Sequence, residues 1–130
     1  MTQEDKQLLV KDLCARLLYG VIVNAQYKDG EGWKTEDRKL KGIYDDGQVY
    51  IDCVYTNIEN TKPYLRPMSS MTEEEQVQLG RLLGTTSFNL LKGKYSSLKE
   101  LLEYSYKNHI DLFGLISKGL ALEAPEGMYK

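Results

Sequence analysis

Side chains that carry metal or nucleophilic chemistry are scarce in this sequence. It has one histidine, His109, and two cysteines, Cys14 and Cys53, among 130 residues. A single imidazole excludes sites built from several histidines, and two cysteines this far apart fit neither a zinc knuckle nor a redox pair. We therefore expect no metal and no cofactor, and we interpret both cysteines as small apolar residues buried in the core.

Long apolar runs and clusters of one charge are also missing. The first residues lack the basic and apolar regions of a signal peptide, and no stretch has the length of a membrane span. The sequence thus predicts a cytoplasmic protein without membrane contact. There are 17 Lys and Arg residues against 19 Asp and Glu residues. This balance disfavours tight non-specific nucleic-acid binding, which needs clustered cations.

The spacing of apolar side chains predicts a helix followed by strands. Thr2 and Asp5 approximate a capping box at the start of a helix over residues 3–18. Apolar side chains then recur at helical intervals, namely Leu9, Val10, Leu13, Cys14, Leu17 and Leu18. From Val21 the period becomes two, which predicts a strand over residues 21–27 and a less regular hairpin arm over residues 33–38.

A second hairpin and a helical C-terminal half complete the predicted fold. Asp45-Asp46-Gly47 predicts a tight turn between strands at residues 40–44 and 48–55, with Tyr55 on the core face and Tyr50 opposite. Thr72 and Glu75 form another capping box, a further helix follows over residues 98–105, and Asp111 is expected to cap a short one over residues 112–118.

These elements predict an α+β fold in a single domain over residues 1–130. Its order is an N-terminal helix, a three- to four-stranded antiparallel meander, and then two to three helices. A meander this short can also curl into a small SH3-like barrel.

No catalytic motif is assembled in the sequence. Ser105 or Ser69, with His109 and Asp111, is compatible with a hydrolase triad, yet no Gly-x-Ser-x-Gly elbow surrounds either serine. A Walker A loop ending near Lys94 fails because Phe88 stands where a glycine is required. We predict no catalytic residue, and we interpret His109 as a helix-end histidine, with an acid-base role as the alternative.

Two features stand out as candidate binding elements. Ten tyrosines are many for this length, and those on strands, including Tyr50, favour a partly exposed aromatic surface. The strip over residues 63–68 holds two prolines around three large side chains, which sets an extended backbone. It is either a connector that plugs the core or a docking surface. The candidate binding residues are Tyr64, Leu65, Arg66, Tyr50 and His109.

Three segments carry a resemblance to a known family. They are KDLCARL (residues 11–17), KPYLRPMSSMTEEE (residues 62–75) and the ending GLALEAPEGMY (residues 119–129). Through them the chain resembles a family of small proteins of unknown activity from gut anaerobic bacteria and their phages. The resemblance implies a bacterial or mobile-element setting and assigns no functional residue. The ending itself is expected either to pack as an arm or to serve as a linear binding strip.

Three functions follow as hypotheses. The first is a non-enzymatic interaction or accessory protein with a protein partner, because no catalytic constellation is present and aromatic side chains mark the strands. The second is a nucleic-acid-associated factor that uses Lys92, Lys94, Lys99 and Lys107. The third is a small enzyme centred on His109.

Overall fold

The chain begins with a capped helix. The computed structural model describes residues 1–44, 47–51, 54–93 and 96–129, and helix α1 spans Gln3–Arg16. Thr2 Oγ1 accepts a hydrogen bond from the backbone N–H of Asp5 at 3.1 Å, which confirms the predicted cap. A 3₁₀ turn, η1 (Leu17–Tyr19), leads to Gly20, whose φ of 71° turns the chain toward the first strand.

Helix α1 buries a different face from the one predicted. Leu9 and Leu13 are fully buried as expected, but Leu18 is 90% exposed and Cys14 is exposed. The expectation that Cys14 is buried is therefore wrong, while Cys53 lies outside the described residues. The cause is that the polar residues Asp12 and Arg16 occupy the buried positions next to Leu9 and Leu13.

A mixed sheet is built around the first strand. Strands β1 (Ile22–Asp29), β2 (Gly32–Lys39), β6 (Thr61–Leu65) and β7 (Leu122–Glu123) lie in the order β2-β1-β6-β7. Strand β1 is antiparallel to β2 and β6, whereas β7 runs parallel to β6. The predicted period-two burial is confirmed in and just before β1, at Val21, Val23, Ala25 and Tyr27.

The second hairpin forms, but its long strand is broken. Strands β3 (Gly42–Ile43), β4 (Gln48–Ile51) and β5 (Val54–Asn57) make an antiparallel sheet of their own. The strand expected to run to Tyr55 instead turns back, so that Tyr50 pairs with Tyr55 and the two do not face opposite ways. Thr56 Oγ1 donates to the carbonyl of Gln26 at 2.6 Å, which ties β5 to β1.

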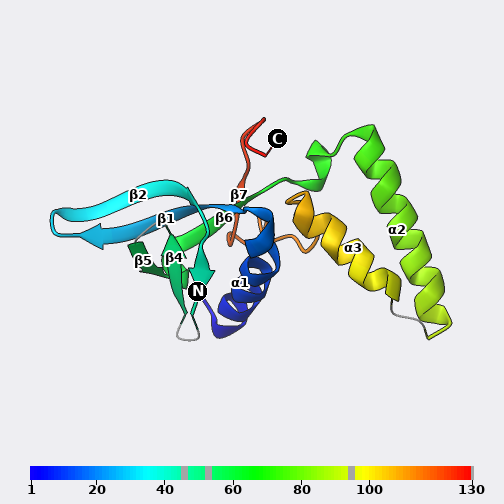
Figure 1. The fold of residues 1–130 in the computed structure, drawn as a ribbon, viewed down its shortest axis with the longest axis horizontal. Helices are drawn as coiled ribbons and strands as arrows, with labels where there is room; N and C mark the ends of the chain where they lie inside the picture. The colour runs from blue at the N-terminus through cyan, green and yellow to red at the C-terminus, as the bar shows by residue number, and fades with distance from the viewer. Residues whose placement is uncertain (45–46, 52–53, 94–95, 130) are drawn as a thin grey trace.

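The C-terminal half is a helical hairpin beside the sheets. Helices α2 (Glu73–Leu91) and α3 (Ser96–Lys107) pack on each other and extend away from β1 and β2 (Figure 1). The fold is thus α+β with helices after the strands, as predicted, and the sheet does not close into a barrel. The short helix expected over residues 112–118 is a series of turns, although the Asp111 carboxylate does accept from the backbone N–H groups of Leu115 and Ile116.

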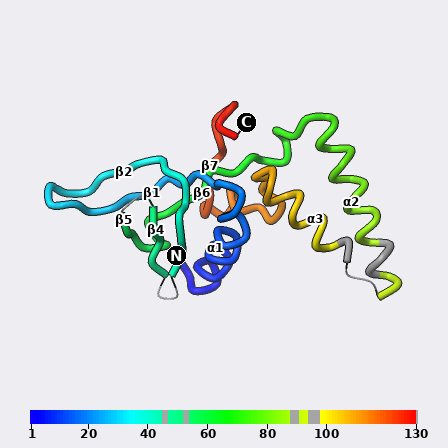
Figure 2. Tube along the Cα trace, viewed as in Figure 1, coloured from blue at the N-terminus to red at the C-terminus, as the bar shows by residue number. Residues whose placement is uncertain are grey.

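Buried side chains form a larger and a smaller hydrophobic cluster among the described residues. The larger lies between α1 and the strands and includes Leu115, Leu120 and Ala121 from the C-terminal segment. The smaller joins α2 to α3 through Met71, Leu79, Leu101 and Ile110. The trace in Figure 2 shows the chain passing from β6 out to α2 and returning from α3 to the sheet. The helical hairpin is therefore joined to the sheet through the segment after β6 and the segment after α3.

Candidate functional site

His109 lies where α3 ends and the chain returns to the sheet. Its side chain is 4% exposed and its φ is 57°, in the left-handed region. The backbone N–H of Arg66 donates to the carbonyl of His109 at 2.7 Å, and the N–H of Asp111 donates to the carbonyl of Arg66 at 2.9 Å. This parallel bridge brings together Arg66 and His109, two of the predicted binding residues.

Tyr129 completes the surroundings of His109. The two rings stack with centroids 3.8 Å apart and planes at 19°. The Tyr129 hydroxyl accepts from the N–H of Ile22 at 2.9 Å and donates to the carbonyl of Tyr64 at 2.7 Å, and burial raises the pKa of Tyr129 to about 12. The sequence placed Tyr129 only in an arm of undecided role, because no local pattern shows which distant strand a terminal aromatic will meet.

These residues line a pocket of about 350 Å³, called here the His109 pocket. Its cationic side chains are Lys39, Arg66 and Lys107, and no described lining residue is acidic. The Arg66 guanidinium is already paired, because Nη1 and Nη2 donate to the Glu75 carboxylate at 2.8 and 2.5 Å. The two lysines therefore supply the pocket's unbalanced positive charge.

The imidazole of His109 is neutral at neutral pH. Burial, followed by the positive charge of Arg16, lowers the pKa of His109 from 6.5 to about 4. The Tyr19 backbone acts in the opposite direction, because a hydrogen bond to it favours the charged form of the ring. The Nδ1 atom of the ring is buried and has no hydrogen-bond partner within the described chain.

A buried ion pair between Arg16 and Asp12 lies near His109, since the Arg16 charge acts on the imidazole. Arg16 is 0% exposed, its Nε donates to Asp12 Oδ2 at 2.9 Å and its Nη2 donates to the carbonyl of Ile110 at 2.8 Å. The guanidinium carbon lies 5.1 Å from the centre of the Tyr106 ring. Burial raises the pKa of Asp12 despite the neighbouring Arg16 charge. Sequence reasoning missed this pair, whose four-residue spacing on α1 was the available signal.

The hypothetical triad is not formed. Ser105 Oγ donates to the carbonyl of Leu101 at 3.1 Å, and the Asp111 carboxylate accepts from two backbone N–H groups at 2.7 and 3.0 Å. Both side chains are thus committed to the backbone, and the His109 ring stacks on Tyr129. Across the described ranges, no group of three or more His, Cys, Asp or Glu residues is placed to hold a metal ion.

The proline strip forms strand β6 and the chain just after it. Leu65 is fully buried in the larger cluster. The Tyr64 hydroxyl donates to Asp37 Oδ1 at 2.9 Å, and Arg66 pairs with Glu75 as described. These three side chains therefore have internal partners, and the binding role predicted for them stays a prediction.

Tyr50 belongs to a separate aromatic surface. With Tyr44 and Tyr55 it forms what we call the tyrosine cluster, in which the Tyr50–Tyr55 ring centroids are 4.8 Å apart and those of Tyr44 and Tyr55 are 5.7 Å apart. Tyr44 is 49% exposed and Tyr55 52% exposed. Tyr27, by contrast, is buried in the core.

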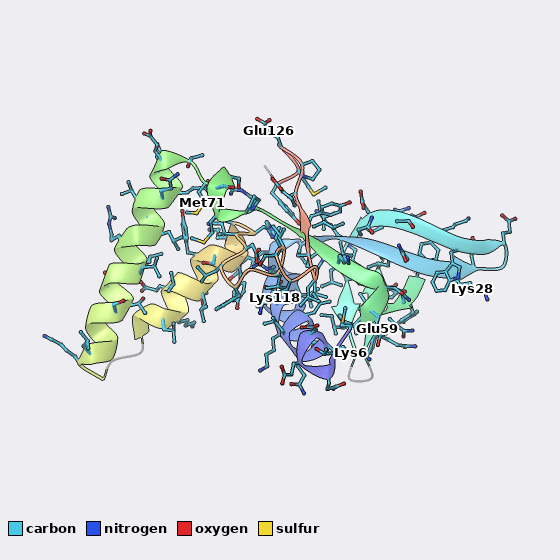
Figure 3. All side chains as sticks on the ribbon, turned by 180° about the vertical axis from the view of Figure 1, so that it is seen from behind. Lys6, Lys28, Glu59, Met71, Lys118 and Glu126 are labelled. Carbon is cyan, nitrogen blue, oxygen red and sulfur yellow. The ribbon has the colours of Figure 1, made fainter. Side chains whose placement is uncertain are left out.

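The tyrosine cluster adjoins a groove between α1 and β3. This α1 groove has a volume of about 770 Å³ and includes Tyr44 in its lining, together with the apolar side chains of Val10, Ile43 and Ile58. Lys6 and Glu59 form an ion pair at its lining and lie close together between α1 and the strands in Figure 3. The groove also has polar and charged lining residues, namely Gln3, Lys6, Gln7, Lys11, Asn57 and Glu59, and Tyr44 joins it to the aromatic rings.

The lysines proposed for nucleic acid do not act alike. Lys99 pairs with Glu103 at 3.8 Å, Lys107 lines the His109 pocket, and Lys94 lies outside the described residues. Lys92, Lys99 and Lys107 are exposed, and the nucleic-acid role proposed for these lysines stays a prediction.

Comparisons with known proteins identify no relative: no family model, no curated protein and no solved structure matches the chain. Within the described residues, no helix has both the length and the apolar character that crossing a membrane requires. Functional inference therefore rests on the surfaces of the molecule itself.

Proposed function

We propose that this protein is a non-enzymatic interaction protein that binds a protein partner through the tyrosine cluster and the α1 groove. The observation that carries the proposal is the set of three contacting tyrosine rings, two of them about half exposed. Tyrosine is enriched in protein interfaces because it offers a large apolar ring and a hydroxyl at little cost in side-chain entropy.

The residues that line the α1 groove indicate which kind of partner segment binds there. Val10, Ile43 and Ile58 offer contacts for an apolar side chain beside Tyr44, and the polar residues that also line the groove, Gln7 and Asn57 among them, offer hydrogen bonds to the backbone of a bound segment. The partner segment is therefore an extended chain that inserts an apolar residue into the α1 groove and lies across the tyrosine rings. A bacterial or phage cytoplasmic setting, implied by the family resemblance, is part of this proposal.

Site-specific photo-crosslinking tests the proposal. A benzoyl-phenylalanine at position 44 is compared with one at position 33, because Trp33 on β2 is also exposed, at 64%, but belongs neither to the tyrosine cluster nor to the lining of the α1 groove. In nuclease-treated lysate of the source cells, we expect one defined protein to crosslink at position 44 and not at position 33. Equal products at both positions would contradict the proposal.

The captured partner then gives a quantitative test. With both proteins purified, we expect Tyr55→Ala to weaken binding by about tenfold or more, as for an aromatic residue central to an interface. Trp33→Ala is the matched control and leaves the dissociation constant unchanged. Circular dichroism verifies that both variants keep the fold. A Tyr55→Ala protein that folds and binds like wild type would show that the cluster is not the interface.

A further inference from the structure

Helix α2 has an exposed face with the residue spacing of a helix–helix contact. Its inner side packs on α3 through Leu79 and the partly buried Leu82. The far side carries exposed residues at alternating intervals of three and four, namely Val77, Gly80, Gly84, Ser87 and Leu91. Leu83 borders them, and Val77, Leu83 and Leu91 are 62%, 41% and 89% exposed. We call these six residues the outer face of α2.

The position of α2 in the molecule leaves its outer face accessible. Figure 1 shows α2 at one end of the long axis, with α3 between it and the sheets, and Figure 3 shows the same arrangement from behind. The side of α2 that points away from α3 therefore points away from the whole protein. A second helix can lie along it without meeting α1 or the strands.

Two glycines lie in the middle of the outer face. A Cβ atom at Gly80 or Gly84 would meet no atom within 4 Å, so packing inside the chain does not require glycine at either position. Glycine in a helix interior lowers helix stability relative to alanine. Because the distance between two packed helices depends on the side chains at their contact, these glycines suit the close approach of another helix.

The charges at the two ends of α2 indicate that the other helix is a second copy of α2. Residues 73–80 hold three glutamates and no lysine or arginine, while residues 92–99 hold three lysines and no acidic residue. Glu73, Glu74 and Lys92 are all exposed. When two copies lie antiparallel, the acidic start of each helix meets the basic end of the other, and the two helix dipoles are also opposed. The surface is thus complementary to itself, as a two-fold contact requires.

We propose that the outer face of α2 binds the same face of a second copy of this chain in an antiparallel two-fold dimer. Gly80 of one copy lies opposite Gly84 of the other, and Leu91 lies beside the first turn of the opposite helix. The contact uses one helix of 19 residues, about 28 Å long. Such a contact is smaller than a standard interface, so dimer and monomer exchange at micromolar concentrations. The face shares no residue with the tyrosine cluster or the α1 groove, and the proposal does not depend on the proposed protein partner.

Sedimentation equilibrium of the full chain tests whether the dimer exists. Between about 5 µM and about 1 mM protein, we expect the average mass to rise from that of one chain to that of two and to rise no further, because a two-fold contact is closed. A mass that stays at one chain over the whole range would overturn the proposal and leave the face to a partner of another kind. A mass that passes two chains would contradict the closed dimer.

Variants at the two glycines locate the contact. Gly80→Gln/Gly84→Gln places longer side chains of a better helix former on the outer face, so helix content by circular dichroism is kept while the dissociation constant of the dimer rises about tenfold or more. Thr85→Gln is the matched control, because Thr85 is exposed on α2 but lies outside the outer face, and it should dimerise like wild type. Equal dissociation constants for the two variants would refute the contact.

The tyrosine cluster is tested in the same experiment. We expect Tyr55→Ala to leave the dissociation constant of the dimer unchanged, since Tyr55 lies on β5. A Tyr55→Ala protein that dimerises as weakly as the glycine variant would assign the dimer to the tyrosine cluster and overturn the proposal. Loss of the dimer and loss of the proposed protein partner are thus separate results.

Charge reversal tests the antiparallel orientation. At low ionic strength, Glu73→Lys/Glu74→Lys places lysines opposite Lys92 of the other copy, and we expect the dimer to weaken about fivefold or more. Adding Lys92→Glu to this variant restores opposite charges and should recover part of the affinity. In a parallel dimer like ends face each other, so the added change would bring no recovery. A triple variant that binds no tighter than the double variant would overturn the antiparallel arrangement.

Discussion

Arg16 is the largest of the fully buried side chains among the described residues, and its charge is met by a single carboxylate oxygen. Asp12 Oδ1 and Arg16 Nη1 find no partner in the part of the chain that the structure describes. Burying two charges with incomplete hydrogen bonding costs free energy, and the raised pKa of Asp12 reflects that cost. The pair nevertheless fixes α1 to the end of α3, because Arg16 Nη2 reaches the carbonyl of Ile110.

Replacing Arg16 alone should be severe. Arg16→Met leaves the Asp12 carboxylate buried without its cation, and we expect the free energy of unfolding to fall by about 3–5 kcal/mol. The double variant Asp12→Leu/Arg16→Met removes both charges and should recover most of that loss. Urea unfolding measures all three proteins.

An exposed ion pair gives the control for this prediction. Lys34 pairs with Asp29 at 2.7 Å on the surface, so Lys34→Met should change stability little. If Arg16→Met were no worse than Lys34→Met, or if the double variant were no better than Arg16→Met, buried charge would not explain the site.

The same residues show where prediction from sequence stopped. Leu9, Asp12, Leu13 and Arg16 are the buried positions of α1 and follow one helical face at intervals of three and four residues. The sequence has this spacing, but a rule that selects apolar residues replaces Asp12 and Arg16 with Cys14 and Leu18. Beside Asp12, the buried arginine contacts the Ile110 carbonyl and the Tyr106 ring, and the spacing on α1 does not reveal these two partners, which are distant in sequence.

Among the elements, the start of α2 is the most closely predicted. The backbone N–H of Glu75 donates to Thr72 Oγ1 at 3.2 Å, and the N–H of Thr72 donates to Glu75 Oε1 at 3.0 Å, so the capping box is confirmed. Glu75 also receives both Arg66 bonds. One carboxylate thus caps the helix and attaches it to the end of β6, and the Arg66 charge with these bonds lowers the pKa of Glu75 to about 2.

This attachment predicts a pH-dependent stability. The pKa of Glu75 is lowered in the folded state from 4.5 to about 2, so its contribution is complete above pH 4.5 and is lost as the pH falls toward 2. We expect Glu75→Gln to lower the free energy of unfolding by about 1–2 kcal/mol at neutral pH, the partial exposure of the pair limiting the effect. The difference from wild type should shrink steadily between those two pH values.

Glu74 offers the matched control, because it lies in the same first turn and is exposed. Urea unfolding of Glu74→Gln should show a small effect from the helix dipole alone. A Glu75→Gln penalty that stayed constant down to low pH would argue against the ionised carboxylate as its source.

For other elements the sequence predicted that a strand is present but not where it ends or which strand it pairs with. The Asp-Gly pattern predicted the β3–β4 hairpin, and Tyr44 N–H indeed donates to the carbonyl of Gln48 at 2.8 Å. The alternation after it continues through Tyr55 without a turn signal that the sequence rules would detect, so β5 appeared as part of β4. The parallel β6–β7 pair joins Tyr64 to Leu122, and no local pattern carries that information.

At the scale of the whole molecule, the C-terminal segment closes the fold. Tyr129 reaches Ile22 at the start of β1 and Tyr64 in β6, β7 adds an edge to the sheet, and Ala124 N–H donates to the carbonyl of Leu65 at 2.8 Å. The segment after α3 is therefore part of the core and not an appendage to it.

Removing the Tyr129 hydroxyl should loosen this closure. Tyr129→Phe keeps the stack on His109 but leaves the Ile22 N–H and the Tyr64 carbonyl unpaired, and we expect a loss of about 1–3 kcal/mol in the free energy of unfolding. Hydrogen exchange should accelerate more at the Ile22 amide than at Val49 in the other sheet. Tyr44→Phe, at an exposed site, is the control. Unchanged stability and exchange in Tyr129→Phe would show that the hydroxyl bonds do not hold the arm.

The closing role of the C-terminal segment also sets an order of events during synthesis. The ribosome makes β1, β2 and β6 well before Leu115, Leu120 and Tyr129, yet these later residues fill the core and pair with those strands. Until they emerge, the face of the sheet that they cover is exposed to solvent and to other nascent chains. The sheet therefore reaches its final packing only after translation has passed residue 129, while the hairpin of α2 and α3, whose contacts are local, is able to form earlier.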